Sequence, residues 1–232
     1  MNRRQFSSMS VATLLAYSAV RQAQALTLSD LSGTDASQGL KAALEKGALA
    51  AVGILGTQDG FLGNEKVRIP LPKFLDATAT LLRTFGQGGK VDELVMAMNR
   101  GAEAAVPKAK DLLVKAVQTM TVNDAKGILG GGATAATEFF ETRTRPQLAT
   151  RFLPIVTQAT GKLGLAAKFN EVAGKAADLG LVNKDDANIQ KYVTNNALNG
   201  LFFMIAQEEK KIRDNPAGYG SAILGKVFGA LK

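Results

Sequence analysis

The chain has 232 residues and a formal net charge of +8, and it contains no cysteine, histidine or tryptophan. The missing cysteine excludes disulfides and thiol nucleophiles, and the missing histidine removes the usual general base and the commonest transition-metal ligand. An enzyme would have to use carboxylate, arginine, lysine, tyrosine or serine chemistry. A metal site would have to be all-oxygen, hence calcium or magnesium. No motif for one is recognised, and we expect no cofactor, no metal site and no catalytic residue.

Residues 1–25 have the features of a cleaved export signal. They combine a basic start, a short apolar run over residues 10–20 and the small-x-small sequence Ala23-Gln24-Ala25. The run is too short for a membrane span, which needs about 20 apolar residues. Arg3-Arg4 is similar to the twin-arginine export pattern, and an ordinary secretory signal is the alternative. We expect a periplasmic protein cleaved near Ala25.

The charge that remains after cleavage is modest. Residues 1–25 hold three arginines and no acidic residue, which leaves 25 basic against 20 acidic side chains, a net charge of +5. Nucleic-acid binders usually carry a clustered basic stripe, so we expect no nucleic-acid partner. Contact with a membrane surface through a final helix over residues 220–231 is possible, but docking of that helix onto the protein is favoured.

Apolar spacing in the mature chain predicts helices almost throughout. The first should follow Asp35, which can cap it, and end at Gly56. Further helices are predicted over residues 72–85, 91–120 (divided by Pro107), 121–129, 133–142, 144–160, 165–179, 185–214 and 220–231. Asp185 should cap the longest of them, in which residues 201–205 are apolar on every face and should be buried all round.

The exception to this helical pattern is the segment over residues 57–72, TQDGFLGNEKVRIPLP. It combines turn-forming residues with the large apolar residues Phe61, Leu62 and Ile69, which a solvated linker would not need. No useful stretch alternates apolar and polar residues, so no sheet is expected. The sequence predicts one compact all-α domain, residues 26–232, with a single long irregular loop.

Several stretches of this sequence are similar to one family. They are GFLGN with VRIPLP over residues 60–72, MNRGAE over 98–103, and DAKGILGG over 124–131, and the segments 187–189 and 200–202 also fit. The chain resembles the uncharacterised bacterial domain-of-unknown-function family numbered 4197 over essentially the whole mature length. The resemblance implies an exported, all-helical protein with no assigned activity, and it implies no catalytic residue.

The irregular loop holds the candidate binding residues Asp59, Phe61, Asn64 and Arg68, and Arg100 is a candidate outside it. In one interpretation Arg68 clamps an anionic group that Asp59 or Asn64 orients. In the other, Asp59 and Asn64 only shape turns, and Arg68 pairs with a helix carboxylate. Arg100 is spaced to form an i,i+3 ion pair with Glu103.

Other polar features have a structural and a functional interpretation. The glycine-rich segment 127–134 precedes a helix and can bind phosphate at the helix N-terminus, but a simple break between two helices is favoured. The i,i+4 pair Glu209 and Arg213 is interpreted as part of a solvated helix face. At least one of Asn195, Asn196 and Asn199 is a candidate for burial beside the apolar part of the long helix, where it would bond loop backbone or a ligand, and loop backbone is favoured.

The sequence favours a non-enzymatic protein that binds a small apolar or amphipathic ligand, or a periplasmic protein. This hypothesis rests on the alanine- and glycine-rich helical body and on the irregular loop that apolar residues anchor to it. Peripheral attachment to the inner membrane is one alternative. The other is an enzyme of unfamiliar type that uses carboxylates or arginine with Tyr192 or Tyr219.

Overall fold

The computed structural model describes residues 33–180 and 187–215, and within them it contains helices and loops but no strand. The α-helices are α1 (Gly33–Leu55), α2 (Asp76–Thr84), α3 (Gly88–Ala105), α4 (Lys110–Gln118), α5 (Val122–Gly130), α6 (Ala135–Thr160), α7 (Gly164–Asp178) and α8 (Ile189–Asp214). Short 3-10 turns, η1 (Lys73–Leu75) and η2 (Val106–Ala109), precede α2 and α4. The predicted all-α fold is confirmed.

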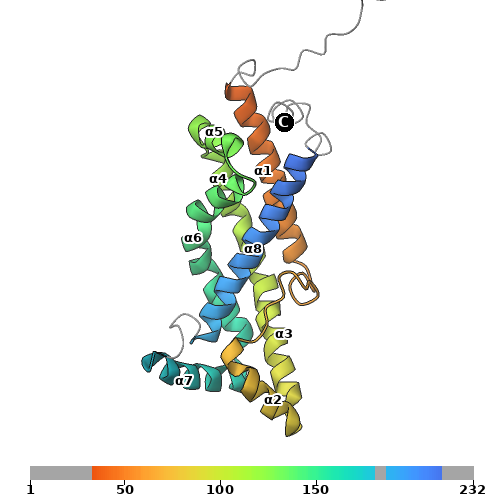
Figure 1. Cartoon of the computed structure of the whole chain (residues 1–232), viewed down its shortest axis with the longest axis vertical. Helices are drawn as coiled ribbons and strands as arrows, with labels where there is room; N and C mark the ends of the chain where they lie inside the picture. Colours follow the sequence, from red (N-terminus) through yellow and green to blue (C-terminus); the bar gives the residue numbers. More distant parts are fainter. Residues whose placement is uncertain (1–32, 181–186, 216–232) are drawn as a thin grey trace, which may run out of the picture.

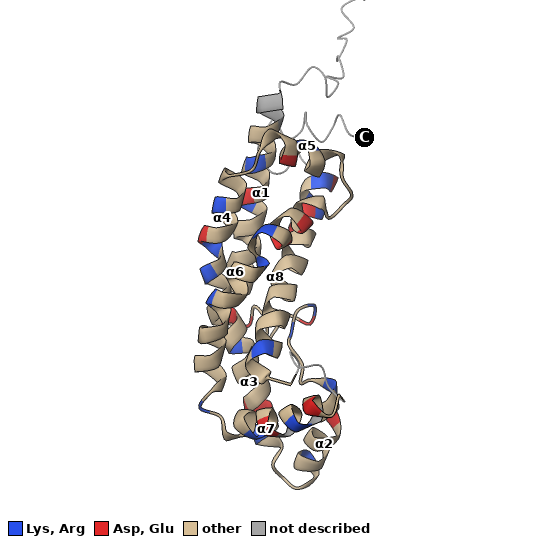
Figure 2. Cartoon of the chain, turned by 90° about the vertical axis from the view of Figure 1, so that its left-hand side faces the viewer, with Lys and Arg blue, Asp and Glu red and all other residues tan. Residues whose placement is uncertain are grey.

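The helices form an elongated bundle around α8 (Figure 1). Helix α8 packs against α6, α1 and α3, and α3 also packs against α6. Helices α4 and α5 lie at the end of the bundle where α1 begins, and α2 and α7 lie at the opposite end (Figure 1). Charges of both signs occur along the bundle and on α2 and α7 (Figure 2).

One hydrophobic core runs through the described α-helices except α2, and α8 contributes many of its members. Leu198, Leu201 and Ile205 of α8 are all buried. The prediction that residues 201–205 are buried all round is wrong at Phe203, which is 39% exposed. No helix in the described ranges is both long and apolar enough to cross a membrane.

Helix α6 differs from its prediction, which placed a break near residue 143. The helix continues through Pro146 and Pro154, although each proline removes one intrahelical hydrogen bond. Its apolar stripe explains this result, because Leu148, Phe152 and Val156 are fully buried against the core. Tertiary packing of such a stripe outweighs the local cost of proline.

Some of the predicted helix caps and breaks match the observed helix ends, and others do not. Thr121 and Asp124 form a capping box at the start of α5, and the break after Gly130 is also confirmed. Helix α1 begins at Gly33, so Asp35 lies inside it and the predicted cap is wrong. Asn188 caps α8, accepting a bond from the Lys191 amide. Asp185 and the predicted final helix lie outside the described residues.

Candidate functional site

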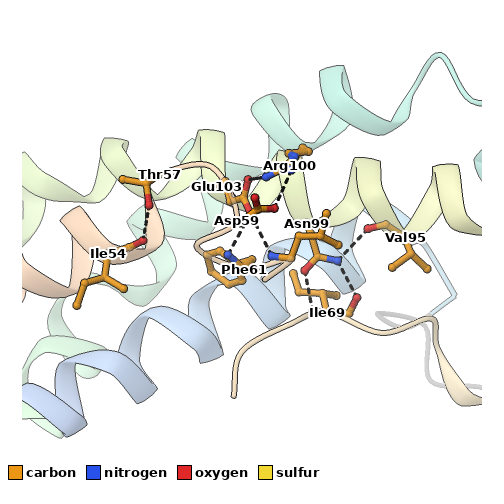
Figure 3. A network of polar contacts seen from close by, with 10 residues as sticks. Ile54, Thr57, Asp59, Phe61, Ile69, Val95, Asn99, Arg100 and Glu103 are labelled. Carbon is orange, nitrogen blue, oxygen red and sulfur yellow. Dashed lines mark hydrogen bonds and ion pairs between the residues drawn. The ribbon is translucent and has the colours of Figure 1, made fainter. Parts of the chain in front are cut away.

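The irregular loop over residues 57–72 is held against α3 by side chains one helical turn apart (Figure 3). We call this loop and the three α3 residues Asn99, Arg100 and Glu103 the clasp. The Glu103 side chain is buried, and its Oε1 accepts hydrogen bonds from the backbone N–H groups of Phe61 at 3.0 Å and Leu62 at 3.1 Å. Buried backbone N–H groups need hydrogen-bond partners, and this irregular loop belongs to no helix or strand that would supply them.

Asn99 holds a second point of the loop. It is fully buried, and its Oδ1 accepts from the Ile69 N–H at 2.8 Å while its Nδ2 donates to the Ile69 carbonyl at 2.9 Å. The same Nδ2 also donates to the Val95 carbonyl at 2.8 Å (Figure 3). One amide therefore satisfies both backbone groups of Ile69, as a neighbouring strand would.

Arg100 links two carboxylates of the clasp, those of Glu103 and Asp59. Its Nη1 donates to Glu103 Oε2 at 2.6 Å, and its Nη2 donates to Asp59 Oδ1 at 2.8 Å. The hydrogen bond to Glu103 is the largest cause that raises the pKa of Arg100 above its ordinary value. The predicted i,i+3 pair is confirmed, and the structure adds Asp59, which has a left-handed φ of 65°.

Phe61 fixes the loop to α8 on its other side. The Phe61 side chain is fully buried, and a Cβ built on Gly200 would lie 2.8 Å from Phe61 Cε1. Only glycine at position 200 leaves room for the ring. Tyr192 Oη also donates to the Pro70 carbonyl at 3.2 Å, so α8 holds the loop at two points.

Asn64 and Arg68 lie on the outer part of the loop. Asn64 Oδ1 accepts from the Lys66 N–H at 3.2 Å, which is the turn-shaping role considered for it. The Arg68 side chain is exposed, and no described residue forms an ion pair with it within 4 Å. The pKa of Asp92 on α3 is lowered mainly by the Arg83 hydrogen bond and, to a smaller extent, by the charge of Arg68, so Arg68 is attracted to a helix carboxylate at longer range. The structure brings Asp59 and Arg100 together and leaves Asn64 and Arg68 apart from them; a binding role for these residues stays a prediction.

The glycine-rich segment ends where α6 begins, and a carboxylate from α8 occupies that helix N-terminus. Glu209 accepts from the N–H groups of Ala136 at 3.0 Å and Thr137 at 2.9 Å, and from the Thr137 hydroxyl at 2.8 Å. Free N–H groups at a helix start favour an anion, and this chain supplies its own.

The interpretation of Glu209 and Arg213 as a solvated pair is wrong. The Glu209 side chain is 3% exposed and that of Arg213 is 18% exposed. Arg213 also donates to the Ile128 carbonyl at 3.0 Å, which ties α5 to α8. The burial prediction for the α8 asparagines is also wrong: Asn195 and Asn196 are half-buried and Asn199 is exposed, whereas the buried amide that bonds the loop is Asn99.

The sequence did not indicate an apolar groove between α2, α3 and α7, which we call the α2–α7 groove. It has a volume of about 290 Å³ and is open to solvent. Its walls include Leu71 of the loop, Leu75 and Leu82 beside and on α2, Val91 and Leu94 of α3, and Phe169 of α7.

The groove exists because α2 is incompletely covered. No residue of η1 or α2 is fully buried, although their apolar residues are spaced for a packed helix face. Phe74 contacts Phe169 with ring centroids 5.3 Å apart, which joins η1 to α7 at one point. The remaining apolar face of α2 lines the groove.

A second, more polar hollow of about 290 Å³ lies next to the groove and shares Leu82, Leu165 and Lys168 with it. Gln87, Lys90 and Glu93 add polar groups to its wall. The two hollows together present an apolar surface that continues into a charged one. Within the described residues, no cluster of three or more acidic side chains is placed to hold a metal ion.

Comparison with known proteins identifies a family without a described activity. Searches of curated proteins and of solved structures found no match. The family described as "Protein of unknown function (DUF4197)" matches residues 30–229. That match spans most of the chain and includes the clasp and the α2–α7 groove. The chain therefore belongs to the DUF4197 family.

Proposed function

We propose that the protein is an exported, non-enzymatic binding protein whose α2–α7 groove holds the aliphatic chain of a small amphiphile. The observation that carries this proposal is the open apolar groove of about 290 Å³ that η1 and α2 leave unfilled. Ligand pockets are concave and mostly apolar, with volumes from about 300 Å³ upward. The groove lies at the small end of that range.

The volume favours one aliphatic chain over a larger apolar body. An apolar cavity of about 150 Å³ is sufficient for benzene, and this groove is roughly twice as large. Burying an apolar chain against the leucine and phenylalanine walls contributes about 0.8 kcal/mol per CH₂ group.

The clasp serves this function by fixing one wall of the groove. Ile69 is held by Asn99, and Leu71, two residues further along the chain, lines the groove. The loop then leads directly into η1 and α2. The carboxylates of Asp59 and Glu103 are engaged by Arg100 and by loop backbone, which supports a positioning role for the clasp over a catalytic one.

A substitution that fills the groove tests the proposal. Ala79 is half-buried in the groove wall, and Ala79→Trp would occupy the space of the aliphatic chain. Ala104→Trp, on the exposed face of α3, is the matched control. The measurement is the fluorescence of N-phenylnaphthylamine, a neutral apolar probe, and its displacement by dodecanol.

We expect saturable binding at one site in the unmodified protein and in Ala104→Trp. Affinity should fall at least about tenfold in Ala79→Trp, because the new indole ring removes the volume that the probe needs. Equal binding by both variants, or no saturable binding by the unmodified protein, would overturn the proposal.

Export to the periplasm is part of the same proposal, and it is supported by the pattern of residues 1–25. A fusion of residues 1–30 to a periplasmic reporter tests it. Replacement of Arg3 and Arg4 by lysine should block export if the signal is of the twin-arginine type, and should leave export intact if the signal is an ordinary secretory one. A reporter that stays inside the cell with the native signal would contradict export.

A further inference from the structure

We infer that the ligand of the α2–α7 groove is an anionic, single-chain amphiphile whose head group lies against Lys168 and Lys90. This inference rests on the proposed function, since it assigns the head group of the molecule whose chain fills the groove. It follows from the position of the charges around the two adjoining hollows.

Lys168 stands at the junction of the apolar and polar hollows. It is an exposed residue of α7 and lines both of them. No described residue forms an ion pair with Lys168. A lysine side chain can lie along an apolar wall through its methylene groups while its ammonium stays in water. This geometry suits a ligand whose apolar chain ends in a negative group.

Lys90 adds a second positive charge to the polar hollow. Its Nζ donates to Gln87 Oε1 at 3.0 Å, and this neutral partner leaves its charge uncompensated. Among the described residues that line the two hollows, Glu93 is the one acidic side chain. Two ammonium groups therefore face one carboxylate, and the balance favours an anion.

The neighbouring charges do not reverse this balance. Asp92 follows Lys90 on α3 but is paired with Arg83 of α2, through two hydrogen bonds from the guanidinium. The Arg83 hydrogen bond is also the largest cause that holds the pKa of Asp92 below its ordinary value. Asp92 is thus already neutralised by a cation outside the groove lining.

The shape and the charge together define the ligand class. A groove of about 290 Å³ accommodates one aliphatic chain, and a lysine binds a carboxylate or a phosphate as a point charge. Free fatty acids and lysophospholipids share this chemistry. The head group stays near water, since both lysines are exposed.

The experiment compares ligands with the same chain and different head groups. Dodecanoate and a lauroyl lysophosphatidate are the anionic probes, dodecanol is the neutral probe, and dodecyltrimethylammonium is the cationic probe. The proteins are the unmodified chain, Lys168→Met and the control Lys126→Met, which changes an exposed lysine of α5. Methionine keeps an apolar stem and removes the charge. Circular dichroism verifies that each variant is folded.

We expect an anion to bind more tightly than dodecanol, and the tighter of the two anions identifies the source of the ligand. Lys168→Met should weaken anion binding about fivefold, which is the upper end of what an exposed ion pair contributes, and leave dodecanol binding unchanged. Lys126→Met should change neither. The double variant Lys90→Met/Lys168→Met should weaken anion binding further.

The outcomes separate this inference from the proposed function. If dodecanol binds in the groove as tightly as both anions, or if Lys168→Met weakens dodecanol and dodecanoate equally, the head-group inference is overturned and the groove remains a chain-binding site. If no probe binds saturably, both the inference and the proposed function are wrong.

Discussion

Removing the Asn99 amide tests the clasp where it is most buried. Asn99→Ala leaves the Ile69 N–H and the Ile69 carbonyl without the partners that now lie 2.8 and 2.9 Å away. Ile69 is itself buried, so water cannot replace these bonds without opening the loop. Each unsatisfied buried group costs about 1–3 kcal/mol, and we expect a total loss of about 3 kcal/mol in the free energy of unfolding.

Urea unfolding followed by circular dichroism measures this loss. The control is Asn123→Ala on the exposed surface of α5, which should stay within about 0.5 kcal/mol of the unmodified protein. Hydrogen exchange at the Ile69 amide gives a local measurement, and its protection should fall sharply in Asn99→Ala. A loss below about 1 kcal/mol with unchanged protection would refute the argument that this amide anchors the loop.

Three further predictions concern packing, an unpaired hydroxyl and pH. Gly200→Ala should lower the free energy of unfolding by about 1–2 kcal/mol, because its Cβ would meet the Phe61 ring at 2.8 Å. In the control Gly127→Ala the new Cβ meets no atom within 4 Å beyond the backbone of its own helix, so this variant should stabilise α5 by up to about 1 kcal/mol; equal effects in urea unfolding would contradict this reasoning. Thr194→Val should raise the melting temperature, since the Thr194 hydroxyl is buried without a partner among the described residues, and a lower melting temperature would show that it has one in solution. The hydrogen bond from the Thr121 N–H is the largest cause that lowers the pKa of Asp124 in the folded chain, so the ionised carboxylate contributes fully to stability above the unfolded pKa of about 3.9 and loses that contribution as the pH falls through the folded pKa. The stability advantage of the unmodified protein over Asp124→Asn should therefore shrink in acid, and a difference that does not change with pH would contradict this reasoning.

The all-helical fold and the irregular loop were predictable because their signals are local. The spacing of apolar residues sets the helices, and Gly and Pro residues mark the loop between α1 and η1. The Arg100–Glu103 pair was predictable for the same reason, since both residues lie on one turn of α3. Local patterns failed near Pro146, which was expected at the start of a separate helix, because the tertiary packing of α6 keeps one helix continuous through it.

The partners of the loop were not predictable, because they are distant in sequence. Glu103 bonds Phe61 across 42 positions, and Asn99 bonds Ile69 across 30. Glu209 shows the same limit: its i,i+4 spacing to Arg213 is identical for an exposed and a buried pair, and only the approach of α6 buries it.

The α2–α7 groove was missed for a related reason. Apolar spacing identifies which face of α2 points inward, and it does not show how completely another helix covers that face. Leu75 and Leu82 look like ordinary core residues in the sequence. In the fold both leucines are only half-buried, because α7 lies beside α2 without covering its apolar face.

Photo-crosslinking with a diazirine analogue of dodecanoate tests the central claim, that the groove holds an aliphatic chain, most directly. Peptide mapping by mass spectrometry should place the label on residues 71–94 and 163–169, which carry the groove walls. Excess dodecanoate should suppress the labelling, and Ala79→Trp should remove it. Labelling centred on α1, α4 or α5, or labelling that dodecanoate does not suppress, would contradict the account.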